Sequence, residues 1–251
     1  MGHDEGPLAG RIILITGAAH RIGRAIALAA AEAGADVVVH YHRSADGAEA
    51  AAEAIRRCGR QAWTLAADLT DPADAAMLIG RAVEIAGPVD ILVNNASIFP
   101  TGLITEATDR DIIENVRVHA VAPLLLSRAL AAQGRAGHII NLLDARITDY
   151  DRRHAAYHLS KRMLADLTRM LAVELAPAIA VNAVAPGLIL PPAGEDESYL
   201  QRLAHTNPLN RYGNPADVAR AVLYLLGSTF VTGQILYVDG GRHMRGSMYA
   251  P

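Results

Sequence analysis

A tyrosine and a lysine four residues apart, Tyr157 and Lys161 in the stretch YHLSK, are the side chains best suited to chemistry in this chain. On a helix this spacing places both side chains on one face. A free phenol has a pKa of about 10, and a nearby ammonium lowers that pKa by favouring the phenolate. Tyr157 is therefore predicted to act as general acid in the reduction of a C=O or C=N bond. Because many helices carry such a pair on an ordinary surface, its meaning depends on its neighbours.

Asp144 follows a predicted strand at residues 137–143 and precedes Tyr157 by thirteen residues. Its carboxyl group could tune proton transfer, or it could cap the segment that follows. In a doubly wound sheet, ligands bind beyond the carboxyl ends of the strands. Asp144 is therefore predicted to lie at the ligand edge of the sheet, where the active residues are expected.

Short β-branched runs alternate with longer stretches rich in Ala and Leu. Strands are predicted at residues 11–15, 36–41, 61–67, 89–96, 137–143, 179–185 and 234–240. Helices are predicted at residues 22–33, 46–57, 70–87, 109–132, 155–175 and 215–226, with strain in the fourth where Pro123 interrupts it. Seven strands alternating with six helices predict a single α/β domain whose parallel sheet is covered by helices on both faces.

The chain has 251 residues, of which 51% are hydrophobic, and an α/β chain of this length usually forms one domain. We place the domain at residues 10–251, after a flexible, acidic and glycine-rich tail at residues 1–9. A long irregular stretch at about residues 188–214 is predicted to be a loop over the substrate. A short helix is expected within that loop, around residues 198–205.

The composition also bounds the partners. The net charge of −3 gives no basic excess for nucleic acid or an anionic membrane, and no signal-peptide pattern opens the chain. No apolar run approaches the roughly 18 residues of a membrane span. A single cysteine, Cys58, excludes an intrachain disulfide and fits a reducing cytoplasm, which is the expected location. No metal site is predicted, and the expected partner is a small molecule.

The first strand leads into ITGAAHRIGRAIA, a turn that holds two glycines and opens a helix near Ile22. Such a turn lets backbone N–H groups meet a phosphate at the positive end of the helix. The common three-glycine dinucleotide fingerprint is absent, so the two glycines could be structural alone. The residues predicted to bind the cofactor here are Gly17, His20, Arg21, Ile22 and Gly23.

The second strand ends in HYHRSAD, where a nucleotide-binding fold often has an acidic residue that selects NAD through a ribose hydroxyl. No acidic residue occurs before Asp46, and His42, Arg43 and Ser44 stand there instead. The Arg43 guanidinium can bind phosphate through a planar fork, and Arg21 supplies a second positive charge at a distance plausible for the same phosphate. These residues predict a seat for a 2′-phosphate, and hence NADPH as cofactor; the alternative is a solvated turn.

Two further strand ends carry candidate cofactor contacts. Asp68 and Leu69 follow the third strand, where an adenine ring would lie. The NNAS stretch follows the fourth strand and brings Asn95, Ala96 and Ser97 to the ligand edge.

The motifs TGAAHRIG, NNAS, YHLSK, NAVAPGL and VTGQILYVDGG, in this order, resemble those of the short-chain dehydrogenases/reductases over nearly the whole chain. The resemblance implies a Rossmann-type sheet of seven strands, nicotinamide chemistry and a homotetramer. It implies that Tyr157 donates the proton and that Lys161 holds the nicotinamide ribose and lowers the pKa of Tyr157. It also implies that Pro186, Gly187 and Leu188 face the carboxamide side of the nicotinamide.

Three positions depart from the usual pattern of that family. Arg21 stands where Gly or Ala is usual, and Asp144 stands in place of a catalytic Ser. His119 stands where the family supplies an Asn to a Lys–water–Asn proton relay. The relay is therefore in doubt, although the loss is small if only the backbone carbonyl of that residue is used.

Arg21, HYHRSA, NNASIF and Asp144–Ala145 resemble the pteridine reductases, and GLIL, FVTGQ and DGGRHMRG resemble the bacterial dihydromonapterin reductases among them. The resemblance implies that Ser97 contacts the cofactor and that Phe99 stacks on a pterin ring, although Phe99 could also be a plain loop anchor. Reduction of a pterin C=N requires a proton on nitrogen, which Asp144 and Tyr157 could supply together. The predicted substrate residues are Arg21, Ser97, Phe99, Asp144 and Tyr157.

Two other functions remain open from the sequence. The first is an NADPH-dependent carbonyl reductase acting on a 3-oxoacyl thioester or a sugar-like ketone, against which Asp144 and Phe99 both argue. The second is a non-catalytic NADPH-binding protein with a regulatory role, which the His119 substitution permits and the intact Tyr157–Lys161 pair opposes.

Overall fold

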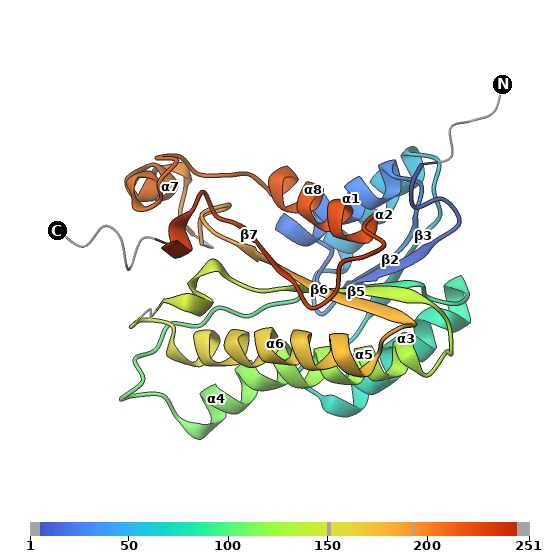
Figure 1. Ribbon diagram of the computed structural model, residues 1–251, viewed down its shortest axis with the longest axis horizontal. Helices are drawn as coiled ribbons and strands as arrows, with labels where there is room; N and C mark the ends of the chain where they lie inside the picture. The colour runs from blue at the N-terminus through green and yellow to red at the C-terminus, as the bar shows by residue number, and fades with distance from the viewer. Residues whose placement is uncertain (1–5, 150–151, 193, 245–251) are drawn as a thin grey trace.

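Seven parallel strands form one sheet in the order β3-β2-β1-β4-β5-β6-β7 in the computed structural model (Figure 1). The structure describes residues 6–149, 152–192 and 194–244. The strands are β1 (Ile12–Ile15), β2 (Asp36–Tyr41), β3 (Ala62–Ala66), β4 (Ile91–Asn94), β5 (Gly137–Leu142), β6 (Ile179–Pro186) and β7 (Ile235–Val238). The predicted single-domain, doubly wound parallel sheet is therefore confirmed, with each predicted strand present.

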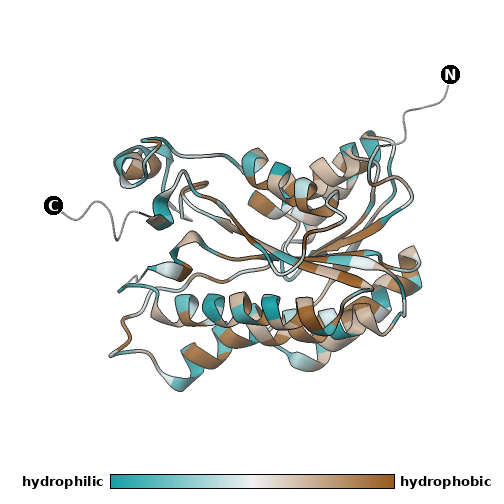
Figure 2. Cartoon of the chain, viewed as in Figure 1, coloured by the Kyte–Doolittle hydropathy of each residue, from teal (hydrophilic) through white to brown (hydrophobic). Residues whose placement is uncertain are grey.

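Helices cover both faces of this sheet, as the parallel strands require (Figure 1). One layer contains α1 (Arg21–Glu32), α2 (Ala45–Arg57) and α8 (Pro215–Leu226). The other contains α3 (Pro72–Ala86), α4 (Asp109–Val116), α5 (Ala122–Ala131) and α6 (Ala155–Glu174). Each layer buries one apolar face against the strands, and Figure 2 shows the apolar residues concentrated on the strands and the inner helix faces.

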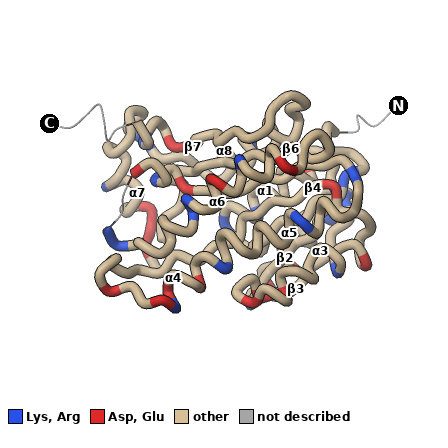
Figure 3. Tube along the Cα trace, turned by 60° about the horizontal axis from the view of Figure 1, so that its bottom comes forward, with Lys and Arg blue, Asp and Glu red and all other residues tan. Residues whose placement is uncertain are grey.

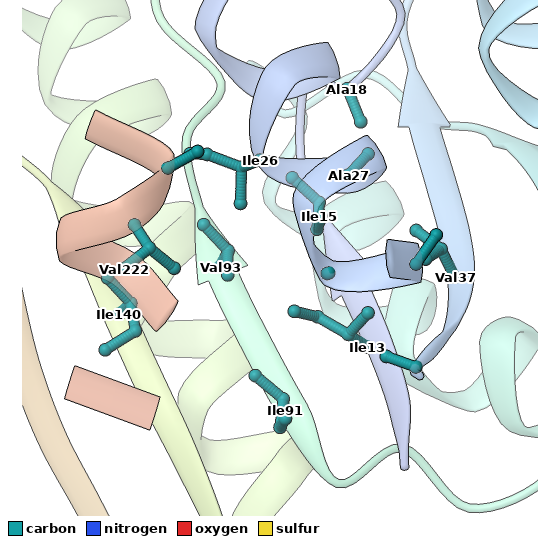
Figure 4. Close-up of a cluster of buried hydrophobic side chains, with 14 of the residues drawn as sticks. Ile13, Ile15, Ala18, Ile26, Ala27, Val37, Ile91, Val93, Ile140 and Val222 are labelled. Atoms are coloured by element: carbon teal, nitrogen blue, oxygen red, sulfur yellow. The ribbon is translucent and has the colours of Figure 1, made fainter. Parts of the chain in front are cut away.

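Branched aliphatic side chains fill the core between the sheet and the α1/α8 layer. Ile13 and Ile15 of β1 meet Ile26 of α1 and Val222 of α8 in this cluster (Figure 4). All four are almost fully buried, and burial of such a side chain contributes about 1.5–3 kcal/mol to folding. The polar residues at the carboxyl ends of the strands are therefore held in place by a well-packed core.

The long helix predicted at residues 109–132 is interrupted. It is divided into α4, a π-helical turn at Arg117–Val121, and α5, whose first turn contains Pro123. Pro123 has no N–H to donate to the carbonyl of His119, and its ring would collide with that carbonyl in a regular α-helix. The expected strain is therefore real, but it is relieved upstream of Pro123 by widening the helix.

The stretch at residues 188–214 contains α7 (Glu197–Leu203), which agrees with the short helix expected there. Leu200 of α7 is buried, and the N–H of Gly213 donates to the carbonyl of Leu188 at the two ends of the stretch. This stretch is therefore attached to the domain at several points.

The prediction of a flexible tail at residues 1–9 is wrong for the residues nearest to the domain. Leu8 is buried in the α1 core, and its N–H donates to the carbonyl of Ala33 over 2.9 Å. Burial of the Leu8 side chain fixes the end of the tail to the domain. The glycine-rich composition did not indicate this contact. Residues 1–5 lie outside the described part of the chain.

In the view of Figure 3, acidic and basic residues are scattered along the chain without a dominant sign. None of the helices in the described residues is long and apolar enough to cross a membrane. Within those same residues, no group of three or more His, Cys, Asp or Glu side chains is placed to hold a metal ion.

Candidate active site

The turn after β1 requires both of its glycines. Gly17 has φ +65°, a conformation that favours glycine, and a Cβ on Gly23 would lie 2.4 Å from the carbonyl oxygen of Gly17. Asn95 fixes the turn, because its Nδ2 donates to the carbonyls of Thr16 and Gly17 over 2.8 and 3.1 Å. The backbone N–H groups of Asn95 and Ala96 donate in turn to the Thr16 hydroxyl. Asn95 and Ala96 therefore support the predicted phosphate turn from behind.

His40 is part of the scaffold and carries no charge toward a ligand. Its Nδ1 accepts from the N–H of Gly17 over 3.0 Å, and its Nε2 lies 3.2 Å from the carbonyl of Ala67. The Gly17 N–H can only donate, so Nε2 carries the proton and donates to Ala67. Burial lowers the pKa of His40 to about 4. His40, near the end of β2, is therefore neutral and links the glycine turn to the residue that follows β3.

The helices α1 and α2 begin at this edge without side-chain caps, as α6 does. The N-cap residues of α1 and α2 are His20 and Ser44, and neither side chain accepts a hydrogen bond from its helix. In contrast, Asp71, Thr108 and Asn214 cap α3, α4 and α8. Uncapped N–H groups at a positive helix end are suited to an anion.

Three exposed side chains follow β2 where a 2′-phosphate was predicted, namely those of His42, Arg43 and Ser44. The ring of His20 lies against Gly47 in the first turn of α2. Asp68 also faces this group, because its Oδ2 lies 3.6 Å from Nε2 of His42. Burial of Asp68 opposes ionisation, but hydrogen bonds from Thr70 and the charges of His42 and Arg43 outweigh it and hold the pKa of Asp68 below its usual value.

The side chain of Arg21 contacts the 188–214 stretch. Its Nη2 donates to the carbonyl of Pro191, in the 188–214 stretch, over 2.7 Å, and its backbone has φ +55°. This contact does not support the prediction that Arg21 and Arg43 share one phosphate, and the substrate role of Arg21 stays a prediction. Sequence spacing placed Arg21 in the turn but could not show the direction of its side chain.

Tyr157, Asp144 and Lys161 come together beyond β5. The Tyr157 hydroxyl donates to Oδ2 of Asp144 over 3.0 Å, and Oδ1 of Asp144 accepts from the N–H of Arg146 over 2.7 Å. Lys161 donates to the carbonyl of Leu142 over 2.6 Å. One oxygen of Asp144 therefore caps the next segment, as one reading expected, and the other accepts from the phenol; a role in proton transfer stays a prediction.

The direction of the Tyr157 pKa is opposite to the prediction. Burial, followed by the adjacent Asp144 carboxylate, raises the pKa of Tyr157 well above 10. The Lys161 ammonium lies 5.7 Å from the centre of the Tyr157 ring, too far to outweigh them. Burial also lowers the pKa of Lys161 to about 8, although Asp144 acts in the other direction. The phenol is therefore held protonated, as a proton donor must be.

Phe99 lies at this site and is about half exposed. Its ring meets the Tyr157 ring edge to face, with centroids 4.7 Å apart, and stacks on the His154 ring at 3.8 Å. The segment that follows Phe99 is joined to the start of α6, because the N–H of Ala155 donates to the carbonyl of Gly102. His154 was not among the predicted site residues, since nothing in its sequence context indicates that its ring reaches Phe99.

His119 is buried in the π-helical turn, and its ring meets the Tyr157 ring at 5.4 Å. Burial, followed by the Lys161 charge, lowers the pKa of His119 well below 6.5. Its Nε2 contacts Ser97 and Ile98, and its Nδ1 contacts Ser160 of α6. The residue that departs from the family pattern therefore connects the loop after β4 with the helix that carries Tyr157.

The remaining predicted residues lie along the same edge. Leu69 and Leu188 are buried, so their side chains belong to the core. Gly187 packs against Asp239, where a Cβ would lie 2.7 Å from the Asp239 Cα. The predicted residues that follow or end a strand are Gly17, His42, Asp68, Asn95, Ala96, Ser97, Asp144, Pro186 and Gly187, while Ile22 and Gly23 lie in the first turn of α1.

Arg242 was also missed. It lies in the DGGRHMRG stretch, on a short 3₁₀ turn at Arg242–Met244 that packs against the 3₁₀ turn at Ala145–Thr148. Burial, followed by the Arg146 charge, lowers the pKa of Arg242, while Asp144 acts to raise it. The motif was visible in the sequence, but its proximity to Asp144 depends on the fold.

A seven-stranded Rossmann-type sheet with a Tyr–Lys pair and an acidic partner at its ligand edge defines a nucleotide-dependent oxidoreductase. The family model described as enoyl-(acyl carrier protein) reductase matches residues 17–243. An uncharacterized oxidoreductase from Mycobacterium tuberculosis is 39% identical over 92% of this chain and 91% of its own length. Versicolorin reductase 1 of Aspergillus parasiticus is 35% identical over 95% and 98%.

Among solved structures, FolM alternative dihydrofolate reductase 1 from Brucella canis, complexed with NADP, superimposes with a TM-score of 0.89. It is 34% identical, and the match covers 97% of this chain and 98% of that one. The chain belongs to the short-chain dehydrogenase/reductase family.

Proposed function

We propose that this protein uses NADPH to reduce a dihydropterin, of the dihydromonapterin, dihydrobiopterin or dihydrofolate type, to the tetrahydro form. The observation that carries the proposal is the hydrogen bond from the Tyr157 hydroxyl to Asp144, next to the half-exposed ring of Phe99. The similarity to the Brucella dihydrofolate reductase supports the same substrate class.

The cofactor site fits a dinucleotide phosphate. The turn that Gly17 and Gly23 permit leads into the uncapped start of α1, and backbone N–H groups at such a helix end suit a pyrophosphate. Arg43, with Ser44 and the uncapped start of α2, suits a 2′-phosphate. The similar Brucella structure holds NADP, which supports the assignment. When bound, NADPH supplies the hydride.

Tyr157 provides the proton, and Asp144 assists it. Hydride addition to a ring carbon of a C=N bond leaves negative charge on the adjacent nitrogen, which must be protonated. A phenol whose pKa is raised keeps its proton until such a base approaches, and the Asp144 carboxylate, which accepts from the hydroxyl, holds the phenol in place. Lys161, buried and held by the carbonyl of Leu142, places a positive charge behind the pair below a pH of about 8.

The test replaces Asp144 by Ser, the residue usual at this position in the family. We expect D144S to lose NADPH-dependent dihydropterin reduction by at least about a hundredfold, the lower range for general acid catalysis. NADPH binding, followed by its fluorescence, should be retained. The nearby acid Asp149, which pairs with Arg146 over 3.3 Å, offers a matched control in D149S. Full pterin activity in D144S would refute the role of Asp144.

A carbonyl reductase is the second candidate, because versicolorin reductase 1 is similar over nearly the whole chain. Asp144 argues against this candidate. Reduction of a ketone needs one proton donor to oxygen, and Tyr157 can fill that role without Asp144. Parallel assays with dihydromonapterin, dihydrobiopterin, dihydrofolate and a 3-oxoacyl thioester separate the two. If none of these four substrates supports NADPH oxidation, the result would instead favour a non-catalytic NADPH-binding protein.

A further inference from the structure

Arg242 stands on a short turn whose backbone is fixed from several sides. The buried carboxylate of Asp239 accepts from the N–H of Gly241 over 2.9 Å and from the N–H of His243 over 2.7 Å. Nδ1 of His243 lies 2.8 Å from the same carboxylate. Gly241 has φ +85°, and a Cβ there would lie 3.0 Å from the ring of Pro208. The turn therefore presents the side chain of Arg242 from a fixed position.

This turn lies at the ligand edge of the sheet. It packs against the 3₁₀ turn at Ala145–Thr148, which begins directly after Asp144. A Cβ on Gly187, which is predicted to face the nicotinamide, would lie 2.7 Å from the Cα of Asp239. Figure 1 shows the turn, in red near the C-terminus, between α7 and the segment that follows β5. Arg242 is therefore placed beside the proposed proton donor and its partner.

The guanidinium of Arg242 is partly buried, and among the residues that the structure describes it forms no hydrogen bond or ion pair. The two carboxylates nearest to it already have partners. The oxygens of Asp144 accept from Tyr157 and from the N–H of Arg146, and Asp149 pairs with Arg146 over 3.3 Å. Because an arginine keeps its charge in a protein, this planar fork of N–H groups is available to a ligand.

The acidic residues before and within α7 do not compensate this charge either. Glu195 lies 3.6 Å from Arg202, and Glu197 accepts from the hydroxyl of Tyr212. Asp196 caps the helix by accepting from a backbone N–H in its first turn. Each of these carboxylates therefore has a partner within its own stretch of the chain.

We propose that Arg242 binds a carboxylate that the substrate carries on a substituent beyond the reduced ring. This inference rests on the proposed function and narrows it to the dihydrofolate type. A dihydrofolate has two carboxylates on its glutamate tail, whereas dihydromonapterin and dihydrobiopterin have none. The planar guanidinium matches a carboxylate through two parallel hydrogen bonds.

A carboxylate suits this position better than a neutral carbonyl of the pterin ring. The charge of Arg146 acts on Arg242 more strongly than that of any other residue, and it is of the same sign. A full negative charge on the ligand offsets that repulsion, and hydrogen bonds between charged groups are about twice as strong as those between neutral ones.

The test compares folate with its dimethyl ester, which has nearly the same size but no charge on the glutamate. The full-length protein is loaded with NADP⁺, so that no turnover occurs. We expect it to bind folate about tenfold or more tightly than the ester, as hydrogen bonds to a charged partner allow. In R242Q this preference should fall close to unity. R211Q is the matched control, because Arg211 is exposed within the 188–214 stretch, and it should keep the native preference.

Titration calorimetry gives the dissociation constants, and thermal unfolding shows whether R242Q is folded. Equal affinities of the native protein for folate and the ester would overturn the inference, as would a native preference in R242Q. An equal loss of both ligands in R242Q would also overturn it, since the contact would then be with the pterin ring.

Failure of this inference is distinguishable from failure of the proposed function. If dihydromonapterin is reduced but folate is not preferred to its ester, the role of Arg242 is refuted and the proposed function stands. If no dihydropterin is reduced and folate still binds through Arg242, the proposed function is refuted and the carboxylate site stands.

Discussion

His40 links the glycine turn, β2 and β3 through one neutral ring. The N–H of Gly17 points at its Nδ1, and its Nε2 proton points at Ala67. A second proton would have to enter on Nδ1, directly against the Gly17 N–H. Acid should therefore act on the cofactor turn through a residue that does not touch the cofactor.

We expect the unfolding free energy to fall as the pH drops from 6.5 toward about 4. In this range the unfolded chain binds a proton at His40 and the folded protein does not, so the unfolded state is favoured. The interval between the ordinary value of 6.5 and about 4 corresponds to a loss of roughly 3 kcal/mol. Urea unfolding at several pH values measures it.

The variant H40N serves as the comparison. Asn can accept from the Gly17 N–H but does not titrate, so its stability should depend less on pH over the same range. The exposed His20 gives the control, because H20N should keep the native slope. Parallel curves for the native protein and H40N would contradict the prediction.

The sequence indicated the types of the residues at the site but not the state of their protons. The spacing of Tyr157 and Lys161 placed them on one face, and the structure brings them together. Yet the ammonium is bound by Leu142, and the phenol by Asp144, so the pKa of Tyr157 moves upward. Burial and the choice of partner set these directions, and both arise only when distant segments pack.

At the scale of elements, α1 approaches β1 closely because Gly23 has no side chain. A Cβ there would lie 2.4 Å from the Gly17 oxygen and 2.5 Å from Nδ2 of Asn95. We expect G23A to lose several kcal/mol of unfolding free energy or its NADPH affinity, because either the helix or the turn must move. Thermal unfolding and NADPH titration measure the two effects.

Gly80 of α3 provides the opposite case. A Cβ at that position meets nothing within 4 Å, and the residue lies inside a helix. G80A should therefore stabilise the protein by about 1 kcal/mol, since Ala is the better helix former. If G23A were as well tolerated as G80A, the close approach of α1 would have no energetic importance.

Strands and most helices could be predicted, because each is a local pattern closed by a stop signal such as Pro177 or Gly87. The π-helical turn could not be predicted, because Pro123 alone does not show whether the helix will be distorted before or after it. The anchoring of Leu8 was also missed. A single apolar residue carries no periodicity, and its place in the core depends on α1.

For the whole molecule, we propose the homotetramer that the family resemblance implies. Several apolar residues on the outer side of α6 support contact with another copy: Leu159, Met163, Met170 and Val173. We expect sedimentation to give four times the chain mass of 26.6 kDa. The substitution M170E should shift the population to smaller species, because it would bury a charge without a partner.

Met77 of α3 allows a matched control, since it is exposed to nearly the same degree, 63% against 66% for Met170. M77E should leave the sedimentation profile unchanged. A native protein that sediments as a monomer, or an M170E variant that stays a tetramer, would show that α6 is not the contact surface.

The π-helical turn at Arg117–Val121 has a consequence for chain length. A π turn holds one residue more than an α-helix needs over the same distance, so α4 and α5 already keep their positions with a surplus residue between them. Loss of one residue there would return the segment to α-helical spacing, but Pro123 would still have no N–H for the carbonyl four residues before it. The same extra residue therefore accommodates Pro123 and places His119, so a deletion would disturb the helix and the site together.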